Sequence, residues 1–208
     1  MKNKNGLISM FKEAGILLAI TLVAGLALGF VYELTKEPIR IQQEKKIQEA
    51  CKAVFTDASE FVKVNIVASP SLQQEFKENG VTVGTVFEAK DASENVLGYV
   101  IETVSSEGYG GNIGLYMGIK NDGTLNGISI LKIAETPGLG MEAENVLSPQ
   151  FVDKKVTKFT VTKTGSQSES ELDAISGATV TTEAITNAVN SGLRFFAELL
   201  QEGGDSDE

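Results

Sequence analysis

The sequence contains no histidine and only one cysteine among its 208 residues. Without histidine, the chain has neither a Ser-His-Asp nor a Cys-His arrangement for nucleophilic catalysis, and it has no imidazole to bind zinc. The single thiol, that of Cys51, forms no internal disulfide and no clustered-thiolate metal site. We therefore expect no catalytic residue and no metal, and any chemistry must come largely from a bound group.

Basic residues are also scarce. The chain has 18 lysines and arginines against 28 aspartates and glutamates, which gives a formal net charge of −10. Because nucleic acids and anionic lipid surfaces attract proteins through positive charge, this balance argues against both as partners. Part of the negative charge lies in residues 202–208, which we expect to form an acidic, disordered tail.

The N-terminal region contains a long stretch without charge, the 19 residues from Ala14 to Tyr32. A helix of that length spans about 28 Å, close to the ~30 Å hydrocarbon core of a bilayer. A secretory signal and a buried core helix are the competing interpretations. The stretch is long for both, and no small-x-small cleavage site follows it near Glu33. We interpret 14–32 as a single transmembrane helix preceded by a short N-terminal segment, 1–13.

Charge does not orient this span. Three lysines precede it and four basic residues follow it, so the positive-inside rule does not decide which end lies in the cytoplasm.

From Pro38 to Phe55, apolar side chains recur at helical spacing and are mixed with charge. We predict a juxtamembrane helix within residues 33–57, with Cys51 packed on its apolar side.

Residues 58–201 are numerous enough for one domain with its own core. Segments rich in β-branched and aromatic residues predict strands at Val81–Glu88, Val96–Val104, Ile113–Ile119, Leu125–Ile133 and Phe159–Val161. Hairpin turns are expected at 91–95 and 121–123, a further turn at Ser69–Ser71, and helices at Ser148–Val152 and Thr181–Leu200. The pattern predicts an α+β domain with a twisted, mostly antiparallel sheet flanked by helices.

Three glycine-rich loops connect these elements: Glu107–Asn112, Glu135–Gly140 and Ser176–Thr179. Each has an ordinary explanation, because glycine favours turns, Pro137-Gly138 suits a type II turn, and an Ala-Thr pair before a helix is a common cap. Together they suit a cofactor with a flat ring and a phosphate. Glycine lets main chain lie against a ring, and a helix N-terminus attracts an anion.

The apolar anchor, the three loops and the run from Asp173 to Thr179 occur in the order found in the FMN-binding domain family. Over about residues 14–200 the chain resembles the G subunit of the Rnf electron-transport complex, with the C subunit of the sodium-pumping NADH:quinone oxidoreductase as the nearest relative. The run Asp-Ala-Ile-Ser-Gly-Ala-Thr resembles the motif at which flavin transferases attach FMN, through its phosphate, to the final threonine.

This resemblance implies a covalent FMN on Thr179, with Asp173 either recognised by the attaching enzyme or capping the loop. Thr181 and Thr182 are rival acceptors. Tyr109 either stacks on the flavin or packs on a sheet edge. The remaining residues expected to shape the attachment loop or to position the cofactor are Ser176, Gly177, Ala178, Glu135, Thr136, Pro137, Gly138, Leu139, Gly140, Gly110 and Gly111.

The resemblance also implies an electron-relay subunit of a membrane-bound, ion-translocating ferredoxin:NAD oxidoreductase. Its partners are other membrane subunits and a flavin transferase. Its N-terminus is expected in the cytoplasm and its domain on the outer side of the cytoplasmic membrane. Two alternatives stay open: a free-standing membrane-anchored flavoprotein for extracellular electron transfer, and a non-redox anchored binding domain whose loops are only turns. The sequence does not indicate whether the coupling ion is sodium or a proton.

Overall fold

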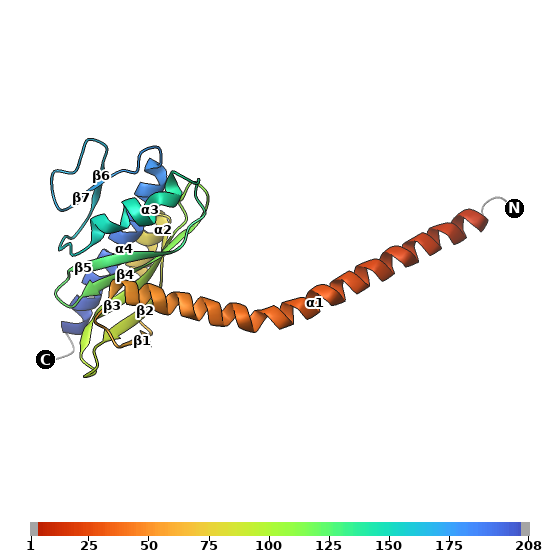
Figure 1. The fold of residues 1–208 in the computed structure, drawn as a ribbon, viewed down its shortest axis with the longest axis horizontal. Helices are drawn as coiled ribbons and strands as arrows, with labels where there is room; N and C mark the ends of the chain where they lie inside the picture. Colours follow the sequence, from red (N-terminus) through yellow and green to blue (C-terminus); the bar gives the residue numbers. More distant parts are fainter. Residues whose placement is uncertain (1–3, 205–208) are drawn as a thin grey trace. The chain divides into compact units, whose positions relative to one another are not determined.

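A computed structural model describes residues 4–204 of the chain, with side chains from 8 to 200. The chain divides into two compact units, Met1–Lys45 and Lys46–Glu208. The first unit consists of most of helix α1 (Lys4–Val54) (Figure 1). From Ile8 onward, α1 is long and apolar enough to cross a membrane, and its most apolar stretch is not buried. Such a surface requires an apolar surrounding, which a bilayer provides.

The two helical segments predicted separately form one continuous helix. Pro38 lies inside it, where the proline nitrogen donates no hydrogen bond. Arg40 forms ion pairs with Glu37 at 2.5 Å and with Glu44 at 2.6 Å, three residues before it and four residues after it. These exposed pairs contribute only weakly to the helix on both sides of the arginine.

The second unit is built on a five-stranded sheet in the order β1-β2-β3-β4-β5 (Figure 1). The strands are β1 (Glu60–Val64), β2 (Val81–Lys90), β3 (Val96–Ser105), β4 (Ile113–Lys120) and β5 (Leu125–Lys132). All neighbours are antiparallel, which confirms the predicted sheet. Both hairpin turns are also confirmed: the Asp91 N–H donates to the Asn95 carbonyl at 3.0 Å, and Gly123 has a φ of +84°.

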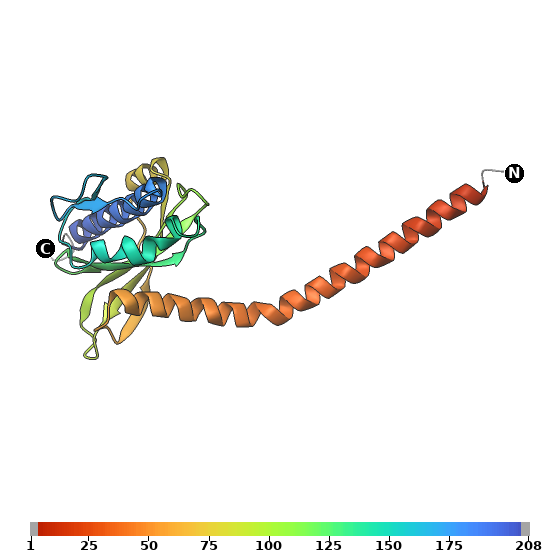
Figure 2. The same ribbon diagram turned by 45° about the horizontal axis from the view of Figure 1, so that its top comes forward.

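Helices cover both faces of this sheet, as Figure 2 shows. Helix α4 (Thr179–Gly204) and helix α2 (Pro70–Glu78) lie on one face, where Ile101 and Met117 are buried. The last turns of α1 lie on the other face, where Val100 and Tyr116 join the buried Cys51. Side chains alternate between the two faces because successive residues of a strand point in opposite directions. The thiol of Cys51 is therefore part of the core, as predicted.

The remaining elements come between β5 and α4 in the chain. They are η1 (Gly140–Glu142), α3 (Ala143–Val146), η2 (Ser148–Phe151), and the separate parallel pair of β6 (Thr160–Thr162) and β7 (Glu171–Asp173). The short helix expected at Ser148–Val152 appears as η2, and the strand expected at 159–161 appears as β6. Helix α4 begins at Thr179, two residues before its predicted start.

Sequence patterns did not predict α2, β1 or β7. The turn expected at Ser69–Ser71 is instead the start of α2. The Ser69 hydroxyl accepts a hydrogen bond from the Leu72 N–H at 3.4 Å, and Pro70 occupies the first turn, where its missing N–H costs little. Strand β1 pairs only with β2 and is partly exposed, so it lacks a clear alternation of apolar residues. Strand β7 is only three residues long.

Candidate functional site

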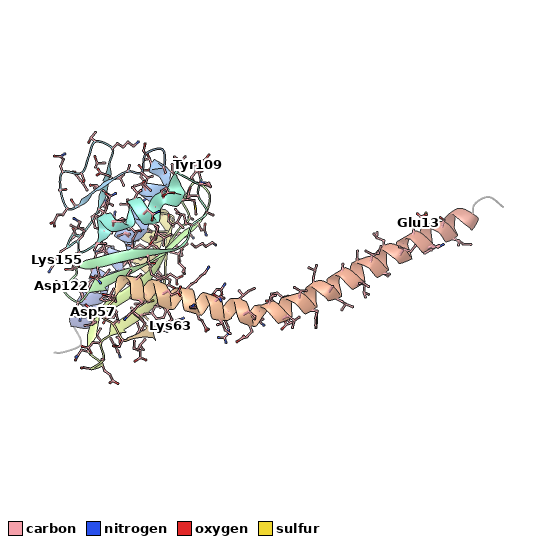
Figure 3. The ribbon with its side chains drawn as sticks, viewed as in Figure 1. Glu13, Asp57, Lys63, Tyr109, Asp122 and Lys155 are labelled. Atoms are coloured by element: carbon pink, nitrogen blue, oxygen red, sulfur yellow. The ribbon has the colours of Figure 1, made fainter. Side chains whose placement is uncertain are left out.

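A cavity of about 580 Å³ lies where the glycine-rich loops meet the N-terminus of α4. It is lined by Tyr109, Glu135, Thr136, Leu139, Gly140, Gly177, Ala178, Thr179, Val180 and Thr181. Residues from all three loops predicted to hold a cofactor therefore share one cavity, although they are far apart in the sequence. Figure 3 shows Tyr109 at this end of the domain, near the start of α4.

The attachment loop is a tight turn immediately before α4. The Ala178 N–H donates to the Ile175 carbonyl at 2.9 Å, and Gly177, the third residue of the turn, has a φ of +76°. That is the position at which a type II turn favours glycine. The Thr182 hydroxyl accepts from the Ile175 N–H at 3.1 Å and donates to the Ala178 carbonyl at 3.0 Å. The first turn of α4 thus fixes the loop that precedes it.

Thr179 is the first residue of α4 and is half-buried in the cavity lining. The first backbone hydrogen bond of the helix runs from the Thr182 N–H to the Ala178 carbonyl at 3.0 Å. Within residues 4–204, the N–H groups of Thr179, Val180 and Thr181 have no acceptor. These donors, at the positive end of a 26-residue helix, form a site for an anion such as a phosphate.

The second loop confirms the predicted type II turn at Pro137-Gly138. The Leu139 N–H donates to the Thr136 carbonyl at 3.1 Å, and Gly138 has a φ of +75°. The turn directs the Leu139 side chain against the attachment loop, because a Cβ on Gly177 would lie 3.0 Å from the Leu139 Cδ2. The second and third loops are therefore in direct contact.

The first loop is joined to the second by Glu135, whose side chain is only 8% exposed. The Glu135 Oε1 accepts a hydrogen bond from the Gly110 N–H at 3.3 Å. Gly110 is so close to the second loop that a Cβ there would lie 1.9 Å from the Ala134 carbonyl oxygen. The Tyr109 side chain is 76% exposed, so of its two proposed roles, packing on the sheet is not observed.

Several predicted residues support the cavity without lining it. Pro137, Gly138 and Ser176 belong to the two turns, and Gly110 and Gly111 to the first loop. Asp173 lies outside the cavity lining. Its carboxylate accepts from the Ser166 N–H at 2.7 Å and from the Ser166 hydroxyl at 3.3 Å. Its carboxylate therefore caps the segment between β6 and β7 rather than the attachment loop.

Two lining residues were not predicted to contact a cofactor. Val180 is 49% exposed at the cavity, and Thr181, considered only as a rival acceptor, is almost fully buried. Both belong to the first turn of α4. The predicted binding loop ended at Thr179, so these two residues were not included in it. Thr182 is fully buried, and its hydroxyl is already engaged in the turn. Thr179 is the most accessible of the three threonine hydroxyls.

The cavity offers an anion little beyond backbone donors. None of its lining side chains is cationic, and Glu135 is the only charged one. A helix N-terminus contributes up to ~2 kcal/mol in a partly buried geometry, which is too little to retain a nucleotide by itself. A cavity of similar size, about 610 Å³, lies between residues 65–68 and the start of β2, but it contains none of the predicted site residues.

Comparison with known proteins identifies the class first. Residues 108–194 match the model of the FMN-binding domain, and residues 1–54 match the RnfG N-terminal region. The cavity lies within the first of these segments, so the site belongs to an FMN-binding domain. The chain also aligns with the crystal structure of Shewanella oneidensis NqrC at 20% identity and a TM-score of 0.48, covering 57% of this chain and 61% of that one.

Relatives identify the family. The G subunit of the ion-translocating oxidoreductase complex of Methanosarcina acetivorans is 33% identical over 189 residues, which cover 90% of this chain and 93% of the relative. The G subunit of the Na⁺-translocating ferredoxin:NAD⁺ oxidoreductase complex of Acetobacterium woodii is 32% identical over 193 residues, covering 91% and 93%. The chain belongs to this family of G subunits of ion-translocating oxidoreductase complexes, which confirms the resemblance. Its apolar N-terminal helix fits a single-pass anchor in such a membrane complex.

Proposed function

We propose that this chain is an electron-relay subunit of a membrane-bound, ion-translocating ferredoxin:NAD oxidoreductase and that it carries FMN esterified to Thr179. The observation that carries the proposal is the convergence of the Thr179 side chain, the free amides of α4 and the Glu135–Gly140 loop on one cavity. Relatives named as subunits of such complexes align with nine-tenths of the chain. Bound FMN would supply the electron transfer that the side chains cannot perform.

The residues of the cavity fit the parts of FMN. The free amides of α4 suit its phosphate. Leu139 and Val180, both partly exposed, offer apolar contact for the ring system, and Tyr109 offers an aromatic face. Gly177 is exposed and leaves its main chain uncovered. The volume of about 580 Å³ is within the usual range for small-molecule sites.

A covalent bond would retain the nucleotide that the helix N-terminus is too weak to hold by itself. In the proposed attachment, the Thr179 Oγ1 forms a bond to the phosphorus of an activated flavin nucleotide held by a flavin transferase. The bond from that phosphorus to its leaving group breaks, and the hydroxyl proton passes to the enzyme or to solvent. Thr179 is favoured over Thr181 and Thr182 because these two are 1% and 0% exposed.

The proposal includes the membrane arrangement. The N-terminus would lie in the cytoplasm and the FMN domain on the outer side, where the flavin would pass electrons between carriers of neighbouring subunits. The relatives do not identify the coupling ion of this chain's complex. The Acetobacterium woodii complex is named as Na⁺-translocating and that of Clostridium ljungdahlii as proton-translocating. The Clostridium ljungdahlii relative is 30% identical over 195 residues, covering 92% of each chain.

The test is a denaturing gel viewed under ultraviolet light. The full chain, co-expressed with a flavin transferase, should give a fluorescent band and an intact mass increased by one FMN residue. Thr179→Ala should be dark, and Thr181→Ala, the matched control, should stay bright. A bright Thr179→Ala band would move the attachment to another residue, and a wild-type band without flavin would refute covalent FMN. Purification from native membranes without other integral subunits would favour the free-standing flavoprotein.

A further inference from the structure

Glu135 is the one charged side chain in the lining of the cavity. It is 8% exposed, and among the described residues its one hydrogen bond is the one that Oε1 accepts from the Gly110 N–H at 3.3 Å. No lysine or arginine among the described residues forms an ion pair with it. The negative charge of Glu135 is therefore not offset by a cation among the described residues.

Packing holds the Glu135 side chain in place between two loops. A Cβ on Gly108 would lie 2.8 Å from the Glu135 Oε1, and a Cβ on Gly140 would lie 2.7 Å from the Glu135 Cβ. Both glycines therefore leave room for this side chain. The Glu135 side chain is therefore confined between the first and second loops, beside the cavity.

We infer that Glu135 sets the reduction potential of the flavin bound in this cavity, an inference that rests on the proposed function. Each electron that the flavin receives from a reduced donor adds one negative charge to it unless a proton follows. A fixed negative charge at the wall of the cavity opposes that addition, because like charges repel each other. Glu135 thus lowers the potential and favours passing the electron onward.

The expected effect is large enough to measure. Neutralising a charge in the lining of the cavity should shift the balance of reduced over oxidised flavin by about tenfold, since charge interactions in a protein are several times stronger than in water. Tenfold corresponds to about 59 mV for a one-electron couple. A merely structural role for Glu135 would change stability and leave the potential where it is.

The experiment is an equilibrium redox titration of the full chain, loaded with FMN and purified in detergent, against dyes of known potential. Glu135→Gln keeps the shape and an oxygen for the Gly110 N–H, and its potential should be higher than that of the wild type. Glu135→Asp keeps the charge and should stay close to the wild-type potential. Glu142→Gln is the matched control, because Glu142 lies in η1 but outside the cavity lining, and it should leave the potential unchanged.

A loaded Glu135→Gln protein with the wild-type potential would overturn the inference and leave the proposed function intact. If Glu135→Gln does not take up flavin, Glu135→Leu removes the same charge in a side chain of similar size, and its potential should also be higher than that of the wild type. An unchanged potential in that loaded variant would equally overturn the inference. A wild-type chain without flavin would instead refute the proposed function.

Discussion

Leu139 and Gly177 meet between two turns of the same kind, the turn of the Glu135–Gly140 loop and the turn before α4. The contact requires glycine, since a Cβ on Gly177 would lie 3.0 Å from the Leu139 Cδ2. The backbone requires it too, since Gly177 has a φ of +76°. One residue therefore satisfies both the shape of its own turn and the approach of a second loop.

Substitution of Gly177 should damage both the fold and the site. In Gly177→Ala, the positive φ costs about 1–2 kcal/mol, and the new methyl group pushes Leu139 away from the attachment loop. We expect a lower melting temperature and weak in-gel flavin fluorescence. Gly165→Ala is the matched control, because Gly165 has a φ of +91° and open space around it. Gly165→Ala should lose a similar amount of stability and keep its flavin. Equal loss of flavin in both variants would contradict the role of Gly177 in the site.

The close approach of the first and second loops should depend on Gly110. A Cβ there would overlap the Ala134 carbonyl oxygen, so Gly110→Ala must separate the loops and break the hydrogen bond to Glu135. We expect loss of most flavin loading, measured as the fluorescence of the gel band per amount of protein. Gly114→Ala is the matched control and should load fully, because a Cβ there would make only ordinary contacts, 3.6 Å from the Lys132 Cβ and 3.8 Å from the Val104 Cγ2. Full loading of Gly110→Ala would show that the first loop does not shape the site.

Asn190 of α4 should stabilise the segment that leads into β6. Its amide accepts from the Phe159 N–H at 2.7 Å and donates to the Phe159 carbonyl at 2.9 Å, as a neighbouring strand would do. Asn190→Ala leaves both backbone groups unpaired and should cost about 1–3 kcal/mol in the free energy of unfolding.

Denaturant unfolding of the soluble portion of the chain would measure the effect of Asn190→Ala. Asn187→Ala, one turn away, removes an exposed hydrogen bond to Glu107 of 3.3 Å and should cost less than about 0.5 kcal/mol. Equal losses in the two variants would argue against the strand-like role of Asn190.

The ionisation of Tyr116 should lower the free energy of unfolding at alkaline pH. Burial raises the pKa of this phenol, and the negative charge of Glu102 raises it further. Below pH ~10 both the folded and the unfolded chain hold the proton, so stability is complete there. Above that pH the unfolded chain loses the proton first, and folding weakens by at most about 1.4 kcal/mol per pH unit.

Melting temperatures between pH 8 and 11 would test the role of Tyr116. Tyr116→Phe keeps the ring in the core and removes the titrating group, so its melting temperature should decline less steeply above pH 10 than that of the wild type. Parallel curves for the two proteins would contradict the assignment.

Removal of residues 1–45 should release a soluble domain. The remaining unit, 46–208, is compact by itself and keeps the turns of α1 that cover one face of the sheet. We expect this fragment to stay in solution without detergent after ultracentrifugation and to melt cooperatively. The full chain should require detergent, because its apolar side chains between Ile16 and Tyr32 are exposed. A fragment found in the membrane fraction would place the anchor elsewhere.

Most of the sheet could be predicted from the sequence, because strands β2 to β5 combine β-branched runs with clear turn signals. The long apolar helix could be predicted equally well, from its 19 residues without charge. The type II turn at Pro137-Gly138 followed from two residues alone, since proline fixes φ in the second position and glycine permits a positive φ in the third. Short or half-exposed elements such as β1 and β7 carry too little pattern to be recognised.

The sequence by itself determined the three glycine-rich loops, the hydroxyl of Thr179 and the family to which the chain belongs, because these depend on residue type and order. Only the tertiary structure decided that the loops share one cavity, that α4 begins at Thr179, and that Glu135 is the charge beside it. Those facts depend on which surfaces the five-stranded sheet and α4 bring together. Contacts between residues so far apart in the chain arise from packing, which no local pattern records.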